Sequence, residues 1–363
     1  MRSRRGLATV AAGVLLLVSA CGTSDETPGG ERGQQSPGSS LTTGDREGLA
    51  EKAERESREQ GAQRVEHVVA ISVDGLAVVA LERLGAAGAP TFHRMLAEGA
   101  GTLNARTAYE ENITLPNHVG MVTGRPIAKA AGGHGVTWNS DLPDDTVQAA
   151  SGDPRIESIF SVAHDAGLTT ALFAGKSKFD ILTDSWPEAF DHQVVREEGT
   201  ARPDALVGET VDHLVEERPN LTFLHLAHPD AIGHAYGGMT RPYLRAVRAV
   251  DTGVTDILAT IEGDDELRDS TLVVLTADHG VTRGEKTHLP HLPTNYAVPF
   301  VVWGAGVQSG DLYALNPDLA DPGRSRPSYD GPQPVRNLQL AGVVLDALAL
   351  PGMEEVEVGE LAW

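Results

Sequence analysis

Acidic and histidine side chains follow three short apolar runs of the sequence, and their chemical types suit the binding of metal ions. They are, in chain order, Asp74 after Val68–Val73, Asp230 and His234 after Leu221–Leu226, and Asp278 and His279 after Leu272–Thr276. Each aspartate taken alone could equally cap a helix or close a turn. Together, three strand ends that deliver such residues to one edge of a sheet favour a site for hard or borderline divalent cations.

The spacing within two pairs agrees with shared metal ligands. Asp230 and His234 are four residues apart, which places both side chains on one face of a helical turn. Asp278 and His279 are adjacent, so they can share an ion only from a loop or a strand end. The chain has one cysteine, Cys21, which excludes a cysteine-rich zinc module and a disulfide framework. Histidine, aspartate and glutamate must therefore supply the ligands.

The runs that precede these residues predict strands, with helical segments between them. Five runs of β-branched and aliphatic residues recur along the chain: Val68–Val73, Thr169–Phe173, Leu221–Leu226, Leu272–Thr276 and Phe300–Trp303. Apolar residues at helical spacing follow, for example within 244–261 and 338–348. This alternation predicts an α/β fold with a mostly parallel central sheet and helices on both faces. Because ligands bind beyond the carboxyl ends of such strands, we expect the site there.

Thr114 is the candidate nucleophile, in a segment where a polar loop turns into a helical stretch. A threonine hydroxyl is a weak nucleophile at neutral pH, but a metal ion bound to it lowers its pKa without a Ser-His-Asp arrangement. With this segment the chain resembles the type I phosphodiesterase/nucleotide pyrophosphatase family of the alkaline phosphatase superfamily. The matching motifs span the body of the chain from Val68 to Gly306: Val73-Asp74-Gly75, Thr114-Leu115-Pro116-Asn117-His118, His134-Gly135-Val136 leading to Asn139, Pro229-Asp230 with Gly233-His234, Thr276-Ala277-Asp278-His279-Gly280, and Thr287-His288 ahead of Val298-Pro299-Phe300.

The resemblance implies an alkaline-phosphatase-like sandwich and two Zn²⁺ ions, although one site could hold another divalent metal. One ion would be held by Asp74, Asp278 and His279, and the second by Asp230, His234 and His288. Thr114 would form a phosphothreonine intermediate, and Asn139 would hydrogen-bond a nonbridging phosphoryl oxygen. His291, three residues after His288, is the alternative last ligand, but the distance from His288 to Val298 fits relatives better.

Lys176 and Lys178, in a loop after the second predicted strand, are candidate substrate-binding residues and leave the substrate class open. Lysines in such loops are often only solvated, whereas similar loops in related phosphatases and phosphonate hydrolases contact a terminal phosphate or carboxylate. We expect a phosphodiesterase or nucleotide pyrophosphatase, with a phosphomonoesterase or phosphonate hydrolase as alternatives. A non-catalytic binding lipoprotein is disfavoured because every ligand position is filled. Segments 124–152 and 183–204 are expected to be inserted loops that set specificity.

The net charge of the chain limits the kinds of partner that it is expected to bind. The 363 residues include 29 Lys+Arg and 51 Asp+Glu, a formal net charge of −22. Nucleic-acid binding is not expected, because such binders carry basic patches that displace counterions from phosphate. A phosphate-ester or nucleotide substrate would instead need local cations at the site. The sequence does not indicate an oligomeric state.

The N-terminal segment predicts export and attachment to a membrane. Three arginines precede an uncharged apolar stretch over 6–20 that is too short to span a bilayer, as in a secretory signal. Val18-Ser19-Ala20-Cys21 resembles a bacterial lipobox, which implies a signal peptide over 1–20 and a lipidated Cys21 on the outer face of the cell membrane. An ordinary cleaved signal peptide is the alternative. Residues 21–64 have the composition of a flexible linker, and the catalytic domain is expected over 65–363.

Overall fold

The structure is a computed structural model that describes residues 64–141, 145–197, 199, 202–288, 292–353 and 361–363. The predicted signal peptide, Cys21 and the linker up to residue 63 lie outside the described residues, as does His291. Lipidation, the linker and the domain bounds therefore remain predictions. Within the described ranges, no helix is long and apolar enough to cross a membrane.

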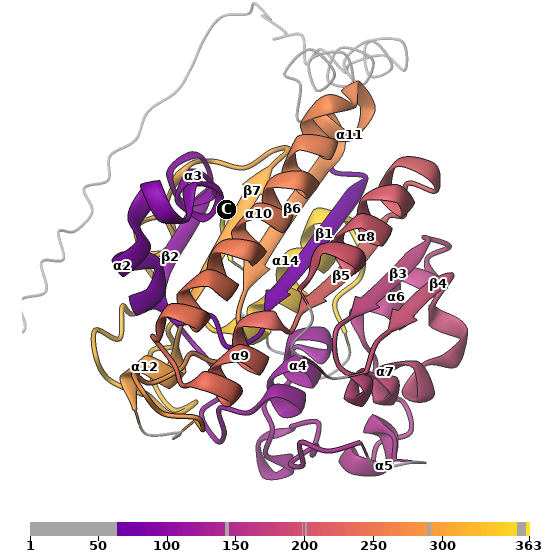
Figure 1. Ribbon diagram of the computed structural model, residues 1–363. Helices are drawn as coiled ribbons and strands as arrows, with labels where there is room; N and C mark the ends of the chain where they lie inside the picture. The colour runs from indigo at the N-terminus through magenta and orange to yellow at the C-terminus, as the bar shows by residue number, and fades with distance from the viewer. Residues whose placement is uncertain (1–63, 142–144, 198, 200–201, 289–291, 354–360) are drawn as a thin grey trace, which may run out of the picture. The chain divides into compact units, whose positions relative to one another are not determined.

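One eight-stranded sheet forms the centre of the fold, in the order β4-β3-β5-β1-β6-β7-β2-β8 (Figure 1). The strands are β1 His67–Val73, β2 Ala100–Arg106, β3 Thr170–Ala174, β4 His192–Val195, β5 Leu221–Leu226, β6 Thr271–Thr276, β7 Ala297–Gly304 and β8 Gly310–Asp311. Strand β7 runs antiparallel to both neighbours, and the other neighbouring pairs are parallel. The predicted mostly parallel sheet is confirmed.

The five predicted strands correspond to β1, β3, β5, β6 and β7, and three further strands were not predicted. Every residue of β1, β5 and β6 is buried, which explains why these strands appear as continuous apolar runs. In contrast, β2 contains glycine, asparagine and arginine, β4 is partly exposed at the sheet edge, and β8 has two residues. Because β4 lies within 183–204, the expectation that this segment is an inserted loop is wrong for that part.

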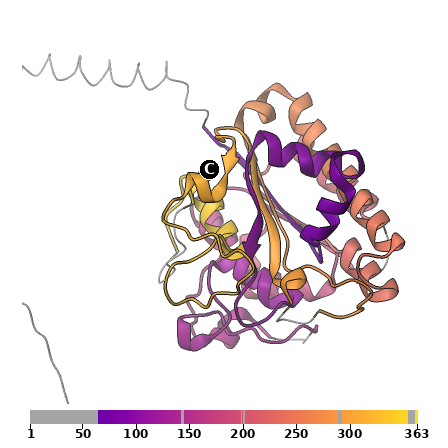
Figure 2. The same ribbon diagram turned by 90° about the vertical axis from the view of Figure 1, so that its left-hand side faces the viewer.

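Helices cover both faces of the sheet. The α-helices are α2 Val78–Gly88, α3 Pro90–Glu98, α4 Thr114–Thr123, α5 Val147–Ser151, α6 Ile159–Asp165, α7 Asp180–Ser185, α8 Asp204–Glu216, α9 His228–Tyr236, α10 Arg241–Gly263, α11 Asp265–Ser270, α12 Pro293–Tyr296, α13 Leu312–Leu315 and α14 Leu340–Ala347. Short 3₁₀ turns are η1 Lys129–Ala131, η2 Ser177–Phe179, η3 Pro187–Ala189 and η4 Asn337–Gln339. Helices α2, α3, α8 and α10 lie on one face, and α6 and α14 lie on the other (Figures 1 and 2). The predicted α/β class is therefore correct.

The sheet brings three strand ends together at one edge. Strand β1 lies between β5 and β6, with Val73 opposite Leu226 and Ser72 opposite Thr276. The residues that follow these three strands must therefore be close in space. Gly75 makes room for them, since it has a positive φ of 69° and a Cβ built there would lie 3.0 Å from the Asp230 Cα.

Candidate active site

Asp74, Asp278 and His279, which we call the inner set, form a buried cluster at the ends of β1 and β6. All three side chains are completely buried. The His279 Nε2 lies 3.2 Å from Asp278 Oδ2 and 3.6 Å from Asp74 Oδ1. These three atoms have no hydrogen-bond partner among the described residues. Buried polar atoms normally have a partner, so their convergence fits a metal ion as the missing one.

The remaining polar atoms of the inner set are held by hydrogen bonds. Asp278 Oδ1 accepts from the N–H groups of Gly75, at 3.0 Å, and His279, at 2.8 Å. His279 Nδ1 donates to the Gly280 carbonyl oxygen at 3.0 Å, which leaves the lone pair of Nε2 for a ligand role. The inner set is therefore oriented for binding by contacts with the backbone.

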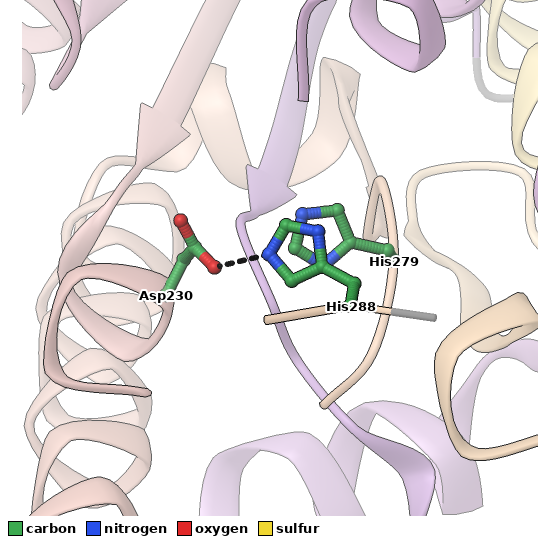
Figure 3. A group of neighbouring side chains, drawn as sticks. All are labelled: Asp230, His279 and His288. Atoms are coloured by element: carbon green, nitrogen blue, oxygen red, sulfur yellow. Dashed lines mark hydrogen bonds and ion pairs between the residues drawn. The ribbon is translucent and has the colours of Figure 1, made fainter. Parts of the chain in front are cut away.

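Asp230, His234 and His288, the outer set, lie beside the inner one. The His288 Nε2 is 3.2 Å from Asp230 Oδ1, the contact drawn in Figure 3, and 3.2 Å from the His234 Nε2. Asp230 and His234 share one face of α9, as their spacing predicted, and the His234 Nε2 is 3.4 Å from Asp230 Oδ1. Figure 3 also shows His279 beside His288, so the two sets are neighbours.

In both outer histidines, Nδ1 is hydrogen-bonded to a backbone carbonyl oxygen. This contact turns the Nε2 atom toward Asp230. His234 Nδ1 lies 2.6 Å from the Lys286 carbonyl oxygen, and His288 Nδ1 lies 3.1 Å from that of Asn112. His288 thus lies together with Asp230 and His234, while His291 lies outside the described residues. The outer set is more open than the inner one, since the His234 side chain is 44% exposed.

Thr114 is the first residue of α4, and all ten residues of this helix are buried. The predicted change from loop to helix is confirmed, and it falls at Thr114, the first residue of this buried helix. The Thr114 Oγ1 lies 3.3 Å from the Lys176 Nζ, and its carbonyl oxygen accepts from His118 Nδ1 at 2.7 Å. Donors at a helix N-terminus favour anions, which suits a nucleophile that attacks phosphate.

Asn139 lies beside Thr114, and its side chain is held by the backbone of α4. Its Oδ1 accepts from the backbone N–H of Leu115 at 2.9 Å, so the contact uses the side-chain oxygen and not the Nδ2 donors. Lys178 donates to the Asn139 carbonyl oxygen at 3.1 Å. Lys178 thus supports the segment that carries Asn139.

Lys176 is directed at the site. It is 1% exposed, and its Nζ lies 2.8 Å from Asp74 Oδ2 and 2.7 Å from Asp230 Oδ2. The sequence suggested a loop lysine that meets the substrate. In the structure, the side chain reaches inward from the end of β3 and contacts the carboxylates that belong to the two sets.

His225 was not predicted to have a role. Its Nδ1 accepts from the Gly175 N–H at 3.3 Å, so its Nε2 carries the proton and donates to Asp74 Oδ2 at 2.9 Å. A signal existed in the sequence, because His225 is the penultimate residue of a strand whose end faces the site. His225 orients Asp74 so that its Oδ1 faces the inner cluster.

The electrostatics of the site favour cations. Burial would raise the pKa of Asp230, but the Lys176 ammonium and hydrogen bonds from His234 and His288 hold that pKa well below its usual range. Burial and the neighbouring Asp74 carboxylate raise the pKa of Asp278 well above its usual value. The hydrogen bond to Asp230 raises the pKa of His234 to about 9. Carboxylates crowded in a buried space are stabilised by added positive charge.

Solved structures of other proteins share this fold. Murine ectonucleotide pyrophosphatase/phosphodiesterase 5 has a similar fold, with a TM-score of 0.57 at 13% identity over 82% of this chain and 97% of that chain. A 2-O GAG sulfatase matches with a TM-score of 0.56 at 15% identity over 82% of this chain and 73% of the other. The fold is the alkaline-phosphatase-like α/β fold of these enzymes.

The sequence itself identifies the family. The model of the type I phosphodiesterase/nucleotide pyrophosphatase family matches residues 68–329, and the chain belongs to this family. GPI ethanolamine phosphate transferase 1 of Gibberella zeae is 29% identical over 228 residues, which cover 59% of this chain and 21% of that protein. The mouse protein of the same name is 36% identical over 97 residues, covering 26% and 10%. The chain spans about a fifth of the first of these relatives.

Proposed function

We propose that the protein is a zinc-dependent phosphoester hydrolase of the phosphodiesterase/nucleotide pyrophosphatase type, with a two-metal site. The inner and outer sets would each hold one ion. The observation that carries the proposal is the convergence of three buried ligand atoms without hydrogen-bond partners among the described residues, next to a second group of possible ligands, Asp230, His279 and His288. Thr114 is connected to both sets through Lys176, whose Nζ contacts Thr114, Asp74 and Asp230.

Thr114 acts as the nucleophile in this proposal. Zinc, when bound, would supply the positive charge that favours the alkoxide and the leaving oxygen. The Thr114 Oγ1 forms a bond to phosphorus while the bond from phosphorus to the leaving oxygen breaks, and that oxygen takes up a proton. A water oxygen then bonds to phosphorus, the bond to Oγ1 breaks, and the threonine hydroxyl is restored. Asn139, fixed by the Leu115 N–H, would direct Nδ2 at a phosphoryl oxygen.

Activity assays test this proposal directly. Zinc-loaded protein should hydrolyse p-nitrophenyl phosphate or bis-p-nitrophenyl phosphate, and excess chelator should remove the activity. The ratio of the two rates separates the expected phosphodiesterase from the alternative phosphomonoesterase, and phosphonoacetate tests the phosphonate hydrolase. No metal-dependent turnover of any of these compounds or of a nucleotide would contradict the hydrolase.

A transferase is the second candidate function, because the curated relatives described above are ethanolamine phosphate transferases. The first step is unchanged, but an alcohol oxygen replaces water in the second step. Adding a small alcohol during turnover separates the two outcomes. A transferase gives an ester of the added alcohol at the expense of the hydrolysis product, which is free phosphate from a monoester or a phosphomonoester from a diester, whereas a hydrolase forms that product at an unchanged rate.

We also propose that the protein is exported and attached to the outer face of a bacterial membrane through Cys21. The support is the lipobox-like Val18-Ser19-Ala20-Cys21 after a short apolar run. Labelling with a radioactive fatty acid should mark the wild-type protein and leave Cys21→Ala unlabelled. Equal labelling of the two proteins would contradict the proposal.

A further inference from the structure

Lys176 contacts one aspartate of the inner set and one of the outer set, in both cases at the Oδ2 atom. Its Nζ contacts Oδ2 of Asp74 and Oδ2 of Asp230, at 2.8 and 2.7 Å. The Oδ1 atoms of these aspartates face the histidines instead: Asp74 Oδ1 lies 3.6 Å from His279 Nε2, and Asp230 Oδ1 lies 3.2 Å from His288 Nε2. The Lys176 ammonium thus contacts the Oδ2 atoms of both carboxylates, and their Oδ1 atoms face the histidines of the two sets.

The fold buries the Lys176 ammonium in the protein interior. Lys176 follows β3, which pairs with β5, and a Cβ on Gly175 would lie 3.1 Å from that of Ala227, just before α9. Lys176, Asp74 and Asp230 are each at most 1% exposed. Removing one partner of a buried ion pair is strongly destabilising, because no solvent replaces the lost partner. Asp278, which is also buried, adds a third carboxylate to the cluster.

We propose that Lys176 is a positioning residue that neutralises the aspartate cluster before metal binds and holds the Oδ1 atoms of Asp74 and Asp230 toward the two metal positions. This inference rests on the proposed two-metal function. It gives Lys176 a role that its sequence context did not indicate, since contact with a substrate was expected there. It also predicts that metal ions take over part of this role: once two cations bind on the Oδ1 side, the carboxylates depend less on the ammonium.

Thermal unfolding of Lys176→Met with and without zinc tests this role. Removing one partner of a buried ion pair should lower the Tm of a protein of this size by about 5–10 °C. We expect that decrease in EDTA, and less than half of it in zinc. Lys178→Met is the matched control, because it removes a neighbouring lysine whose Nζ donates to the Asn139 carbonyl oxygen. Its Tm decrease should be the same in EDTA and zinc.

A double-mutant cycle in EDTA removes one charge of each sign. Lys176→Met should lower the Tm of Asp230→Asn by less than half as much as it lowers that of the wild type. If Lys176→Met alone gives no folded protein, the double variant should recover it, and failure to recover it would overturn the proposal. The proposal would also be overturned if Lys176→Met lowered the Tm equally in EDTA and in zinc, or equally in the wild-type and Asp230→Asn backgrounds. If the proposed function itself is wrong, the result is distinguishable: zinc would not raise the Tm of the wild-type protein, and the wild-type protein would show no zinc-dependent turnover.

Discussion

The inner and outer sets differ in how the fold holds them. The inner set is completely buried, follows two central strands, and is fixed by N–H and carbonyl groups of its own strand ends. The outer set joins α9 to the segment around His288, and its histidines are fixed by carbonyl oxygens of Lys286 and Asn112. One set is thus part of the core, and the other is built partly from connecting segments. The inner set is therefore closed to solvent, whereas the outer set is partly open to solvent at His234.

Thr114 has the largest expected effect, because it would serve both sets. Thr114→Ala should lower turnover by about a thousandfold or more, since it removes the atom that forms the covalent intermediate. Both zinc ions should remain, because three side chains still hold each of them. Steady-state rates and metal content of the purified variant check this prediction. Retention of most of the activity would show that another group attacks phosphorus.

Matched substitutions in the two sets test their difference. Asp278→Asn should lose the inner ion and about a hundredfold or more in activity that added zinc does not restore, since buried surroundings offer no replacement ligand. His234→Asn should also release one ion, but excess zinc should restore much of the activity because water can replace the exposed ring. Zinc titrations of the two variants provide the measurement. Equal recovery by both variants would remove the distinction between the sets.

The elements of the inner set could be predicted from sequence for a physical reason. Strands β1, β5 and β6 are buried on both faces, so their residues are continuously apolar and their polar ends are conspicuous. The pairing of Asp230 with His234 follows from helical spacing alone. Local patterns therefore sufficed where burial and spacing determine the position of a side chain.

Other features depend on contacts between distant parts of the chain. The edge strand β4 and the Gly-containing β2 lack an apolar pattern, because neither is buried along its whole length. The inward direction of Lys176 depends on pairing of β3 with β5, and the contact of His225 with Asp74 depends on the register between β5 and β1. Neither the loop that holds Lys176 nor the strand that holds His225 shows these contacts in its own sequence.

His225 offers a smaller test on the inner side of the comparison. His225→Leu removes the hydrogen bond to Asp74 and should weaken zinc binding at the inner position by about 10–100-fold. His225→Gln is the matched control, because its amide can donate at nearly the same place, and it should bind zinc more tightly than the leucine variant. Competition with a chromophoric chelator gives both affinities. Equal affinities for the two variants would show that this hydrogen bond does not orient Asp74.

His134, which belongs to neither set, gives the smallest expected effect. Burial lowers its pKa to about 3, so folding favours the neutral ring. The unfolded chain takes up this proton below about pH 6.5, and the stability that depends on the neutral ring is lost as the pH falls from there toward 3. In EDTA, urea unfolding of the wild type should lose about 2 kcal/mol more than His134→Asn between pH 7.5 and pH 5. Identical losses would contradict a buried neutral His134.

The most direct test of the central claim is to trap the covalent intermediate. Zinc-loaded protein is mixed with p-nitrophenyl phosphate, quenched in acid within one turnover, and digested for mass spectrometry, with Thr114→Ala treated in parallel. We expect a phosphoryl group on the peptide that contains Thr114, formed only with metal and absent from the variant. Turnover that leaves Thr114 unmodified, or a phosphoryl group on another residue, would contradict it.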